Sequence, residues 1–341
     1  MMIATPYLLY LGNSTDPYAI KTARGLAVFR PEQCVAEYRS DECPLTLGLP
    51  RMSFSEAVAK GARTMVLGIV NSGGTLEKTV IEDATKAMEA GLDLASGLHR
   101  RLKDEPRLVE AAQRTGRLLH DVRDPPEGLM VGTGDPRPGN RLLTVGTDCS
   151  SGKMYTTLAL QRGMHARGIA CDFRATGQTG ILVAGAGIPL DAVVADFISG
   201  AIEQLAPARH DGGWDLIEGQ GSLFHPSFAG VSTGLLHGAQ PAALVMCHDP
   251  TRRVMRGLTH RAPPDLAECI AANLATAHLT SPDVRMIGIA LNTSSLDQNE
   301  AIALCLRLQD DHGLPCTDPH RMGVEPILDA LLGPAEGVAR A

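Results

Sequence analysis

The chain has 341 residues and a net charge of −7, from 31 Lys and Arg against 38 Asp and Glu. Because single hydrophobic cores stop growing near about 250–300 residues, we expect two domains. A hydrophobic fraction of 44% with 20% charged residues is typical of a globular protein. The acidic balance provides no broad positive field, which argues against nucleic acid or an anionic membrane surface as a partner.

No uninterrupted run of about 18 apolar residues occurs, and the start of the chain lacks the pattern of a signal peptide. We therefore expect a cytoplasmic protein. The eight cysteines are spaced singly, and neither a C-x-x-C pair nor an H-E-x-x-H motif is present, so no metal site is expected. A homo-oligomer is expected on general grounds, because compact metabolic enzymes are commonly symmetric.

Short apolar runs alternate with helical stretches along the chain, which predicts parallel sheets with crossover helices. In the first half, strands are expected at 7–11, 64–70 and 118–122, and helices at 53–60, 75–90 and 106–115. Ser53 and Glu56 form a possible capping box for the first of these helices. In the second half, strands at 141–145, 168–173, 214–218, 242–247 and 286–291 alternate with helices at 153–167, 264–278 and 298–312.

Prolines and glycines concentrate between Asp124 and Asn140, where they cannot continue a helix or a central strand. The predicted organisation is a domain at 1–130, a linker at 131–140 and a domain at 141–341. The predicted fold class is α/β, with an N-terminal Rossmann-like parallel-sheet domain and a C-terminal P-loop NTPase-like doubly wound domain. Polar turns at 12–16, 71–74 and 96–99 suggest that the first domain closes over the second to complete a site.

A strand, a glycine-rich turn, a lysine and a helix follow one another in the order of a P-loop. The glycines let main-chain N–H groups approach an anion, the helix N-terminus adds partial positive charge, and the lysine adds a full one. We therefore expect this turn to bind the phosphate of a cofactor. Its residues are Gly146, Thr147, Asp148, Cys149, Ser150, Ser151, Gly152 and Lys153.

Two features of the turn depart from the pattern G-x-x-x-x-G-K-[ST]. Five residues separate the glycines, and Met154 replaces the hydroxyl residue that normally ligates Mg²⁺. The wider spacing resembles dethiobiotin synthetase, in which a G-T-D-x-x-x-G-K sequence cradles ATP. Phosphate binding is therefore expected, whereas ATP hydrolysis would need a substitute hydroxyl such as that of Thr156 or Thr157.

Glu218 ends an apolar strand and is followed by glycines, at the sheet edge where open α/β folds bind ligands. Such a carboxylate could hold a metal or water, act as a base or orient an amine, or merely cap the next turn. His225 follows closely and could transfer protons or serve the structure alone. Asn292, at the end of another expected strand, could contact the adenine of a cofactor or form a turn.

Further polar side chains follow expected strands and would reach the same sheet edge. The segment 174–180 offers a guanidinium, hydroxyls and an amide, and the turn after residue 247 offers cations to an anionic ligand. An acidic substrate would need such cations. The residues expected to bind the substrate are Arg174, Thr176, Gln178, Gln220 and Arg252.

Together, the motifs at 146–154, 175–180, 218–226 and 291–293 resemble the DgcN-type D-glutamate N-acetyltransferases, within a broader P-loop family. The resemblance spans nearly the full chain, including residues 21–25 and 96–99. It implies transfer of the acetyl group of acetyl-CoA to the amine of D-glutamate, giving N-acetyl-D-glutamate in D-amino-acid catabolism. Coenzyme A carries phosphates that a P-loop can hold, and Met154 fits the family pattern because acyl transfer from a thioester needs no Mg²⁺.

Under this interpretation Glu218 or His225 is the catalytic base and Lys153 holds phosphate. Cys149, at a helix N-terminus, is a further candidate as an acyl-accepting nucleophile, although direct transfer requires none. The main alternative is an ATP-dependent ligase or kinase acting on a small carboxylate, which would use Mg²⁺ and ATP. A nucleotide or coenzyme A sensor without catalysis is another.

Overall fold

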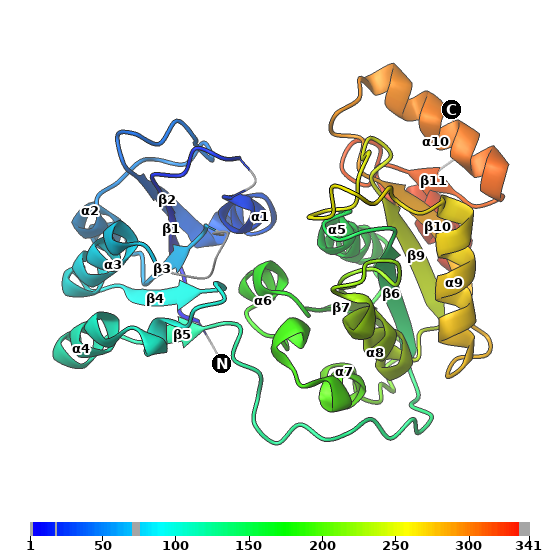
Figure 1. Ribbon diagram of the computed structural model, residues 1–341, viewed down its shortest axis with the longest axis horizontal. Coiled ribbons are helices and arrows are strands. Elements are labelled where there is room, and N and C mark those ends of the chain that lie inside the picture. Colours follow the sequence, from blue (N-terminus) through cyan, green and yellow to red (C-terminus); the bar gives the residue numbers. More distant parts are fainter. Residues whose placement is uncertain (1–2, 18, 70–75, 334–341) are drawn as a thin grey trace. The chain divides into compact units, whose positions relative to one another are not determined.

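The computed structural model describes residues 3–17, 19–69 and 76–333, and the chain divides into two compact units (Figure 1). Unit 1 comprises Met1–Pro125 and Gln178–Ala192, and unit 2 comprises Pro126–Gly177 and Val193–Ala341. Each unit is built on a parallel sheet with helices packed on it, so the predicted α/β class is confirmed. Within the described residues, no helix is both long and apolar enough to cross a membrane.

Unit 1 contains a five-stranded parallel sheet in the order β2-β1-β3-β4-β5. Its strands are β1 (Tyr7–Gly12), β2 (Cys34–Arg39), β3 (Thr64–Leu67), β4 (Asp93–Ser96) and β5 (Leu119–Asp121). Its helices are α1 (Lys21–Phe29), α2 (Phe54–Ala59), α3 (Lys78–Ala90), α4 (Pro106–Thr115) and α6 (Gln178–Ala184).

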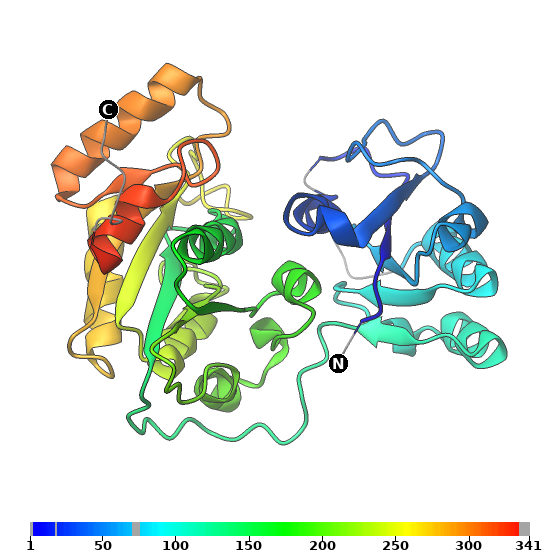
Figure 2. The ribbon, with the colours of Figure 1, turned by 180° about the vertical axis from the view of Figure 1, so that it is seen from behind.

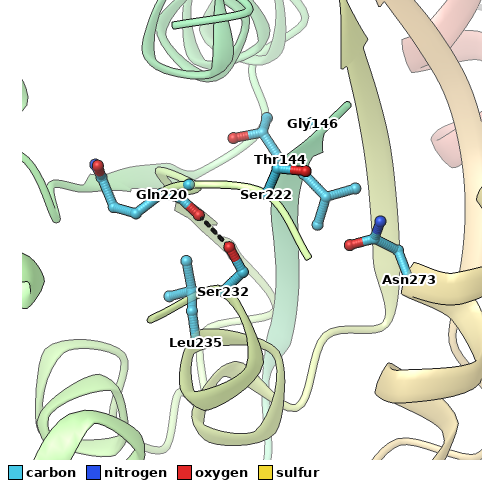
Figure 3. A pocket seen from close by; sticks show the side chains of 9 residues that line it. Thr144, Gly146, Gln220, Ser222, Ser232, Leu235 and Asn273 are labelled. Carbon is cyan, nitrogen blue, oxygen red and sulfur yellow. Dashed lines mark hydrogen bonds between the residues drawn. The ribbon is translucent and has the colours of Figure 1, made fainter. Parts of the chain in front are cut away.

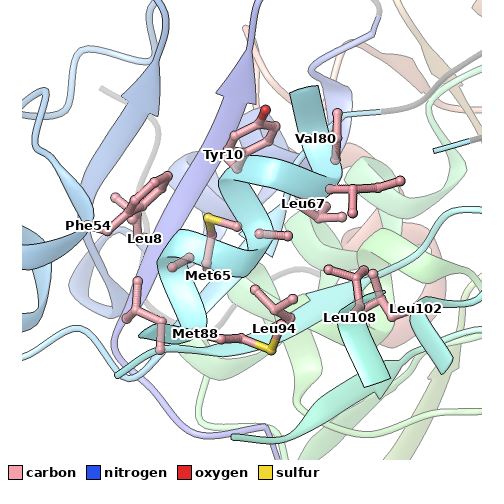
Figure 4. Close-up of a cluster of buried hydrophobic side chains, with 14 of the residues drawn as sticks. Leu8, Tyr10, Phe54, Met65, Leu67, Val80, Met88, Leu94, Leu102 and Leu108 are labelled. Carbon is pink, nitrogen blue, oxygen red and sulfur yellow. The ribbon is translucent and has the colours of Figure 1, made fainter. Parts of the chain in front are cut away.

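One face of this sheet carries α2, α3 and α4, and the buried side chains between them form the core shown in Figure 4. Alternate residues of a strand point to the same face, so Leu8 and Tyr10 of β1 enter this core together. The capping box predicted for Ser53 and Glu56 is present, since the Ser53 hydroxyl accepts from Glu56 N and the Glu56 carboxylate accepts from Ser53 N.

Residues 178–192 come from the second half of the chain but pack with unit 1. Arg30 Nε donates to the Val183 carbonyl at 2.9 Å, the hydroxyls of Thr22 and Thr179 lie 3.1 Å apart, and Arg123 forms an ion pair with Asp191 at 2.6 Å. The sequence division into 1–130 and 141–341 assigned this segment to the second domain. The contacts that tie it to unit 1 are made by residues too distant in sequence for a local pattern to indicate them.

Unit 2 contains a six-stranded parallel sheet in the order β11-β10-β9-β6-β8-β7. Its strands are β6 (Asn140–Gly146), β7 (Cys171–Arg174), β8 (Trp214–Ile217), β9 (Ala243–His248), β10 (Arg285–Leu291) and β11 (Cys316–Thr317). Its helices are α5 (Lys153–Ala166), α7 (Ile198–Leu205), α8 (Ala229–Ala239), α9 (Leu266–His278), α10 (Gln298–His312) and α11 (Glu325–Leu332).

Helices α5 and α11 bury one face of this sheet, whereas α8 and α9 lie on the other (Figure 2). Apolar side chains from α5, α11 and the strands form a continuous core. The Pro/Gly-rich stretch at 122–139 forms neither helix nor strand. Part of it is fastened to unit 2, because Glu203 accepts from the N–H groups of Thr133 and Gly134 and the Gly238 carbonyl accepts from Arg137 at 2.6 Å.

Most predicted strands and helices are present with small shifts of their ends, and Pro106–Thr115 and Gln298–His312 match the predicted ranges. The short strands β2, β4 and β11 and the helices α1, α6, α7, α8 and α11 were not predicted. Several of these are brief or rich in Gly and Ala, so they carry a weak periodic signal. Val70, Thr75 and the polar turn at 71–74 lie outside the described residues.

Candidate functional site

The glycine-rich turn joins the end of β6 to the start of α5, as the sequence predicts. Gly152 has φ 102° and Ser150 has φ 52°, so the loop twice enters the left-handed region before the helix begins. A side chain at Gly146 would place its Cβ 2.5 Å from Ser151 Oγ and 2.9 Å from Lys153 Nζ. A larger residue here would displace the Ser151 hydroxyl and the Lys153 ammonium group, so glycine preserves the place where the loop folds back over its own start.

Lys153 is buried beneath this loop, with 6% of its surface exposed. Its Nζ donates to the Asp148 carbonyl at 2.8 Å and to Ser151 Oγ at 3.4 Å. Burial lowers the pKa of the ammonium group, since it is removed from water. No carboxylate among the described residues lies within ion-pair distance of Lys153, so its cation can pair with a bound anion.

The loop that follows β9 contacts the glycine-rich turn Gly146–Lys153, which we call the phosphate loop. Asp148 Oδ2 accepts from Arg252 Nη1 at 2.6 Å and from the Arg256 N–H at 2.8 Å, while Asp148 Oδ1 accepts from the Cys149 N–H at 2.7 Å. Arg252 also donates to the Cys149 carbonyl at 2.6 Å. The Arg252 guanidinium thus stabilises the phosphate loop. The sequence predicts that this cation binds the substrate, but Asp148 neutralises it.

Glu218 follows β8 and is 4% exposed. Its Oε2 accepts from the N–H groups of Thr176 at 3.0 Å and Gly177 at 3.1 Å. Burial raises the pKa of this carboxyl to about 7, although the two N–H donors and the nearby Lys153 cation oppose the rise. Such a carboxyl exchanges protons near neutral pH, which suits a general base.

The residues that follow Glu218 pack closely against the phosphate loop and the strand before it. The Gly219 N–H donates to Thr144 Oγ1 at 3.0 Å, and a Cβ at Gly219 would overlap the Thr144 carbonyl oxygen and lie 2.9 Å from Lys153 Cδ. Ser222 Oγ donates to the Thr147 carbonyl at 3.0 Å. The carboxylate and the lysine therefore lie next to each other. In the sequence, the place of Glu218 at the end of a strand and the glycines that follow it both indicate this approach.

Thr176 and Gln220 also lie at Glu218. Thr176 Oγ1 donates to the Glu218 carbonyl at 2.6 Å and accepts from Gln220 Nε2 at 3.1 Å. The main-chain carbonyl of Gln220 accepts from Ser232 Oγ at 2.8 Å, and both residues line a cavity of about 10 Å³ (Figure 3). That volume is about enough for one water molecule, so the cavity is too small for a substrate.

His225 is buried, and main-chain groups occupy both of its ring nitrogens. The Ser227 N–H donates to Nδ1 at 3.2 Å, so Nε2 carries the proton and donates to the Arg256 carbonyl at 2.9 Å. An imidazole held in this way has no free lone pair with which to accept a proton. The geometry therefore favours a positioning role for His225 over the role of base.

The carboxylate of Asp148, the Cys149 thiol and a ring nitrogen of His225 all lie within 4.8 Å of one another. Both oxygens of Asp148 and both nitrogens of His225 already make hydrogen bonds. Burial also raises the pKa of the Cys149 thiol, which opposes formation of the thiolate that a metal would need. These three groups do not fit a metal in this arrangement.

Three predicted residues point elsewhere or serve local structure. Arg174 Nε donates back along the sheet to buried Asp215 at 2.8 Å. Gln178 begins α6 in unit 1, where its side chain fills the space beside Gly97. Asn292 Oδ1 accepts from the Ser294 N–H at 3.3 Å and so closes a turn after β10.

The hydroxyls that could replace the missing magnesium ligand are engaged below the loop. Thr157 Oγ1 donates to the Lys153 carbonyl at 2.8 Å and lies 2.9 Å from Thr144 Oγ1. Thr156 Oγ1 accepts from the Cys247 thiol at 3.4 Å. With Met154 in the usual position, the start of α5 offers no free hydroxyl of the kind that P-loop NTPases use.

Comparison with known proteins agrees with this architecture. Residues 130–328 match the P-loop domain, and residues 37–125 the Rossmann-like domain, of a family described as a domain of unknown function, DUF1611. A D-glutamate N-acetyltransferase from Pseudoalteromonas sp is 49% identical over 97% of this chain and 100% of its own length. One from Tritonibacter scottomollicae is 49% identical over 97% of this chain and 99% of its own.

A crystal structure of a DUF1611 family protein from Anabaena variabilis has a TM-score of 0.88 at 33% identity. The match covers 96% of this chain and 99% of that protein. Both domains of the family are thus matched in sequence, and the fold is matched over nearly the whole length. The chain therefore belongs to the DUF1611 family, with an N-terminal Rossmann-like domain and a C-terminal P-loop domain.

Proposed function

We propose that this protein is an N-acetyltransferase that transfers the acetyl group of acetyl-CoA to the amine of D-glutamate. The observation that carries the proposal is 49% identity, over nearly the full chain, to two proteins named D-glutamate N-acetyltransferase. The geometry of unit 2 agrees with this chemistry, because a buried carboxyl that titrates near neutral pH adjoins a phosphate loop.

In the proposed reaction Glu218 is the general base. The amine of an amino acid is protonated at neutral pH and must lose a proton before it attacks the thioester carbonyl. Ionised Glu218 takes one proton from the ammonium group. As the C–N bond forms and the C–S bond breaks, the nitrogen gives up a second proton, which the released thiolate takes up. Glu218 then passes its proton to water and is ionised again. The N–H groups of Thr176 and Gly177 hold Glu218 in place through one oxygen.

Lys153 and the main-chain N–H groups of the loop would hold the pyrophosphate of coenzyme A. The loop Gly146–Lys153 therefore binds the donor at its phosphates. Because Glu218 adjoins Lys153, the pantetheine arm folds back in this proposal, so that its thioester reaches Glu218. Because no hydroxyl residue follows Lys153, this loop holds its anion through lysine and N–H groups and requires no metal. Thr176 and Gln220 are the proposed acceptor-side residues, and Arg174 serves the structure through Asp215.

The test is identification of the product. Purified protein is incubated with deuterium-labelled acetyl-CoA and either D-glutamate or L-glutamate, and the amino acid is analysed by mass spectrometry. We expect the labelled acetyl group on the nitrogen of D-glutamate. Labelling of neither enantiomer, with protein that is folded and binds coenzyme A, would contradict the proposal.

A further inference from the structure

A strongly basic loop lies beside the phosphate loop. Residues 249–261, which we call the basic loop, follow β9 and contain four arginines against a single carboxylate, that of Asp249. The whole chain by contrast has a net charge of −7. This concentration of cations next to the phosphate loop is therefore a local feature that the overall composition conceals.

The basic loop is folded, and its own hydrogen bonds hold it together. Met255 is fully buried, its N–H donates to the Arg261 carbonyl at 2.8 Å, and its carbonyl accepts from the Leu258 N–H at 2.9 Å. A buried apolar anchor with two cross-loop hydrogen bonds gives the main chain a defined path. The arginine side chains therefore extend from a main chain whose position is well defined.

The main chain of Arg256 is tied directly to the phosphate loop and to the Glu218 side of the site. Its N–H donates to Asp148 Oδ2 at 2.8 Å, and its carbonyl accepts from His225 Nε2 at 2.9 Å. This explains two features that the proposed reaction leaves unused, the buried Asp148 carboxylate and the buried His225 imidazole. Both fix the position of the basic loop.

The arginines of this loop differ in their partners. Arg252 is paired with Asp148 and Asp249, at 2.6 and 3.4 Å. Arg253, Arg256 and Arg261 have exposed side chains, and none of them forms an ion pair with another residue that the structure describes. Arg253 follows the paired Arg252 directly, and the Arg256 N–H itself donates to Asp148. These two are therefore the exposed arginines most closely connected to the phosphate loop.

We propose that Arg253 and Arg256 form a second phosphate subsite, which binds the 3′-phosphate of coenzyme A while the phosphate loop binds the pyrophosphate. The inference rests on the proposed function for the identity of the donor. A phosphate monoester carries nearly two negative charges at neutral pH and three acceptor oxygens, which matches guanidinium donors. The subsite would make the protein select coenzyme A thioesters over donors that lack this phosphate.

Calorimetry on the full chain tests this subsite with two probes, coenzyme A and 3′-dephospho-coenzyme A. We expect the wild type to bind coenzyme A more tightly by about tenfold or more, the size of one or two charge-assisted hydrogen bonds. The double variant Arg253→Gln and Arg256→Gln should lose this preference and bind the two probes about equally. Each single variant should lose part of it.

Arg285→Gln is the matched control, because it removes the same charge from an exposed position at the opposite end of the same sheet, the amino end of β10. It should keep the wild-type preference. Circular dichroism and the melting temperature establish that each variant is folded, and both loop substitutions lie at exposed positions.

Equal affinity of the wild type for the two probes would overturn the subsite, as would equal weakening of both probes in the double variant. The proposed function is tested separately by turnover. Acetylation of D-glutamate with equal KM for acetyl-CoA and its 3′-dephospho form would overturn the subsite alone. Selective binding of coenzyme A without acetylation of any glutamate would support the subsite and overturn the function.

Discussion

Replacing Glu218 with glutamine is expected to remove catalysis and, above neutral pH, to stabilise the fold. Burial raises the pKa of this carboxyl from 4.5 to about 7. At about 1.4 kcal/mol for each pKa unit, this difference corresponds to about 3 kcal/mol. The free energy of unfolding of the wild type is highest below pH 4.5, where Glu218 is neutral in both states. It falls as the pH rises towards 7, and above pH 7 it is lower by the full cost of the buried charge. A glutamine side chain at this position keeps the shape and stays neutral.

Two assays follow from this expectation. Urea unfolding at pH 8 should give a higher free energy of unfolding for Glu218→Gln than for the wild type, by up to about 3 kcal/mol, and a much smaller difference at pH 4.5. The wild-type kcat should rise with pH around a midpoint near 7. In the variant kcat should fall by about 10²–10⁴-fold and lose this pH dependence.

Glu218→Asp is the control, since it keeps an ionisable group while moving it away from the N–H donors. It should retain a pH-dependent kcat at a reduced level. The reasoning is refuted if Glu218→Gln keeps the wild-type kcat and pH profile, or if it is destabilised equally at pH 4.5 and pH 8.

Three further substitutions test the surroundings of the site. Lys153→Ala should weaken coenzyme A binding by about 10–100-fold in calorimetry, because the loop loses its buried cation; unchanged affinity would place the phosphates elsewhere. Asp215→Ala should lower the free energy of unfolding in urea by about 1–3 kcal/mol, since Arg174 and Arg209 lose a buried partner but keep Asp172. No measurable change would contradict this. Cys149→Ser should retain kcat, and an acetylated Cys149 detected by mass spectrometry together with an inactive variant would establish covalent catalysis instead.

The phosphate loop could be predicted because its determinants are local. A strand, two spaced glycines, a lysine and a helix follow one another within Asn140–Ala166, and each element forms from residues close in sequence. Glu218 could be predicted for the related reason that a carboxylate at the end of a buried parallel strand reaches the ligand-binding edge. Its raised pKa could not, because burial depends on the packing of Gly219 against Thr144 and Lys153.

The roles of the charged and imidazole side chains depend on partners that the sequence does not bring together. Arg174 follows a strand as expected, but Asp215 on the neighbouring strand turns its guanidinium away from the sheet edge. Arg252 is held by Asp148, which lies far from it in the chain. His225 has the right chemistry for a base, and only the structure shows that main-chain groups occupy both its nitrogens.

The place of residues 178–192 in unit 1 could not be predicted either, because it depends on contacts with residues far away in the sequence. Local sequence identifies a polar turn and an apolar stretch after β7, and this is compatible with a helix of either unit. The partners that decide the matter are Thr22, Arg30 and Arg123, all of them in the first half of the chain.

The measurement that tests the central claim most directly is thiol release from acetyl-CoA in the presence of a chelator and in the absence of ATP. Parallel reactions contain D-glutamate, L-glutamate or no acceptor, with equal amounts of folded protein. We predict release that depends on D-glutamate and is unaffected by the chelator. Absence of release with every acceptor, followed by ATP turnover that requires Mg²⁺ and a small carboxylate, would contradict the acetyltransferase and favour a ligase or kinase.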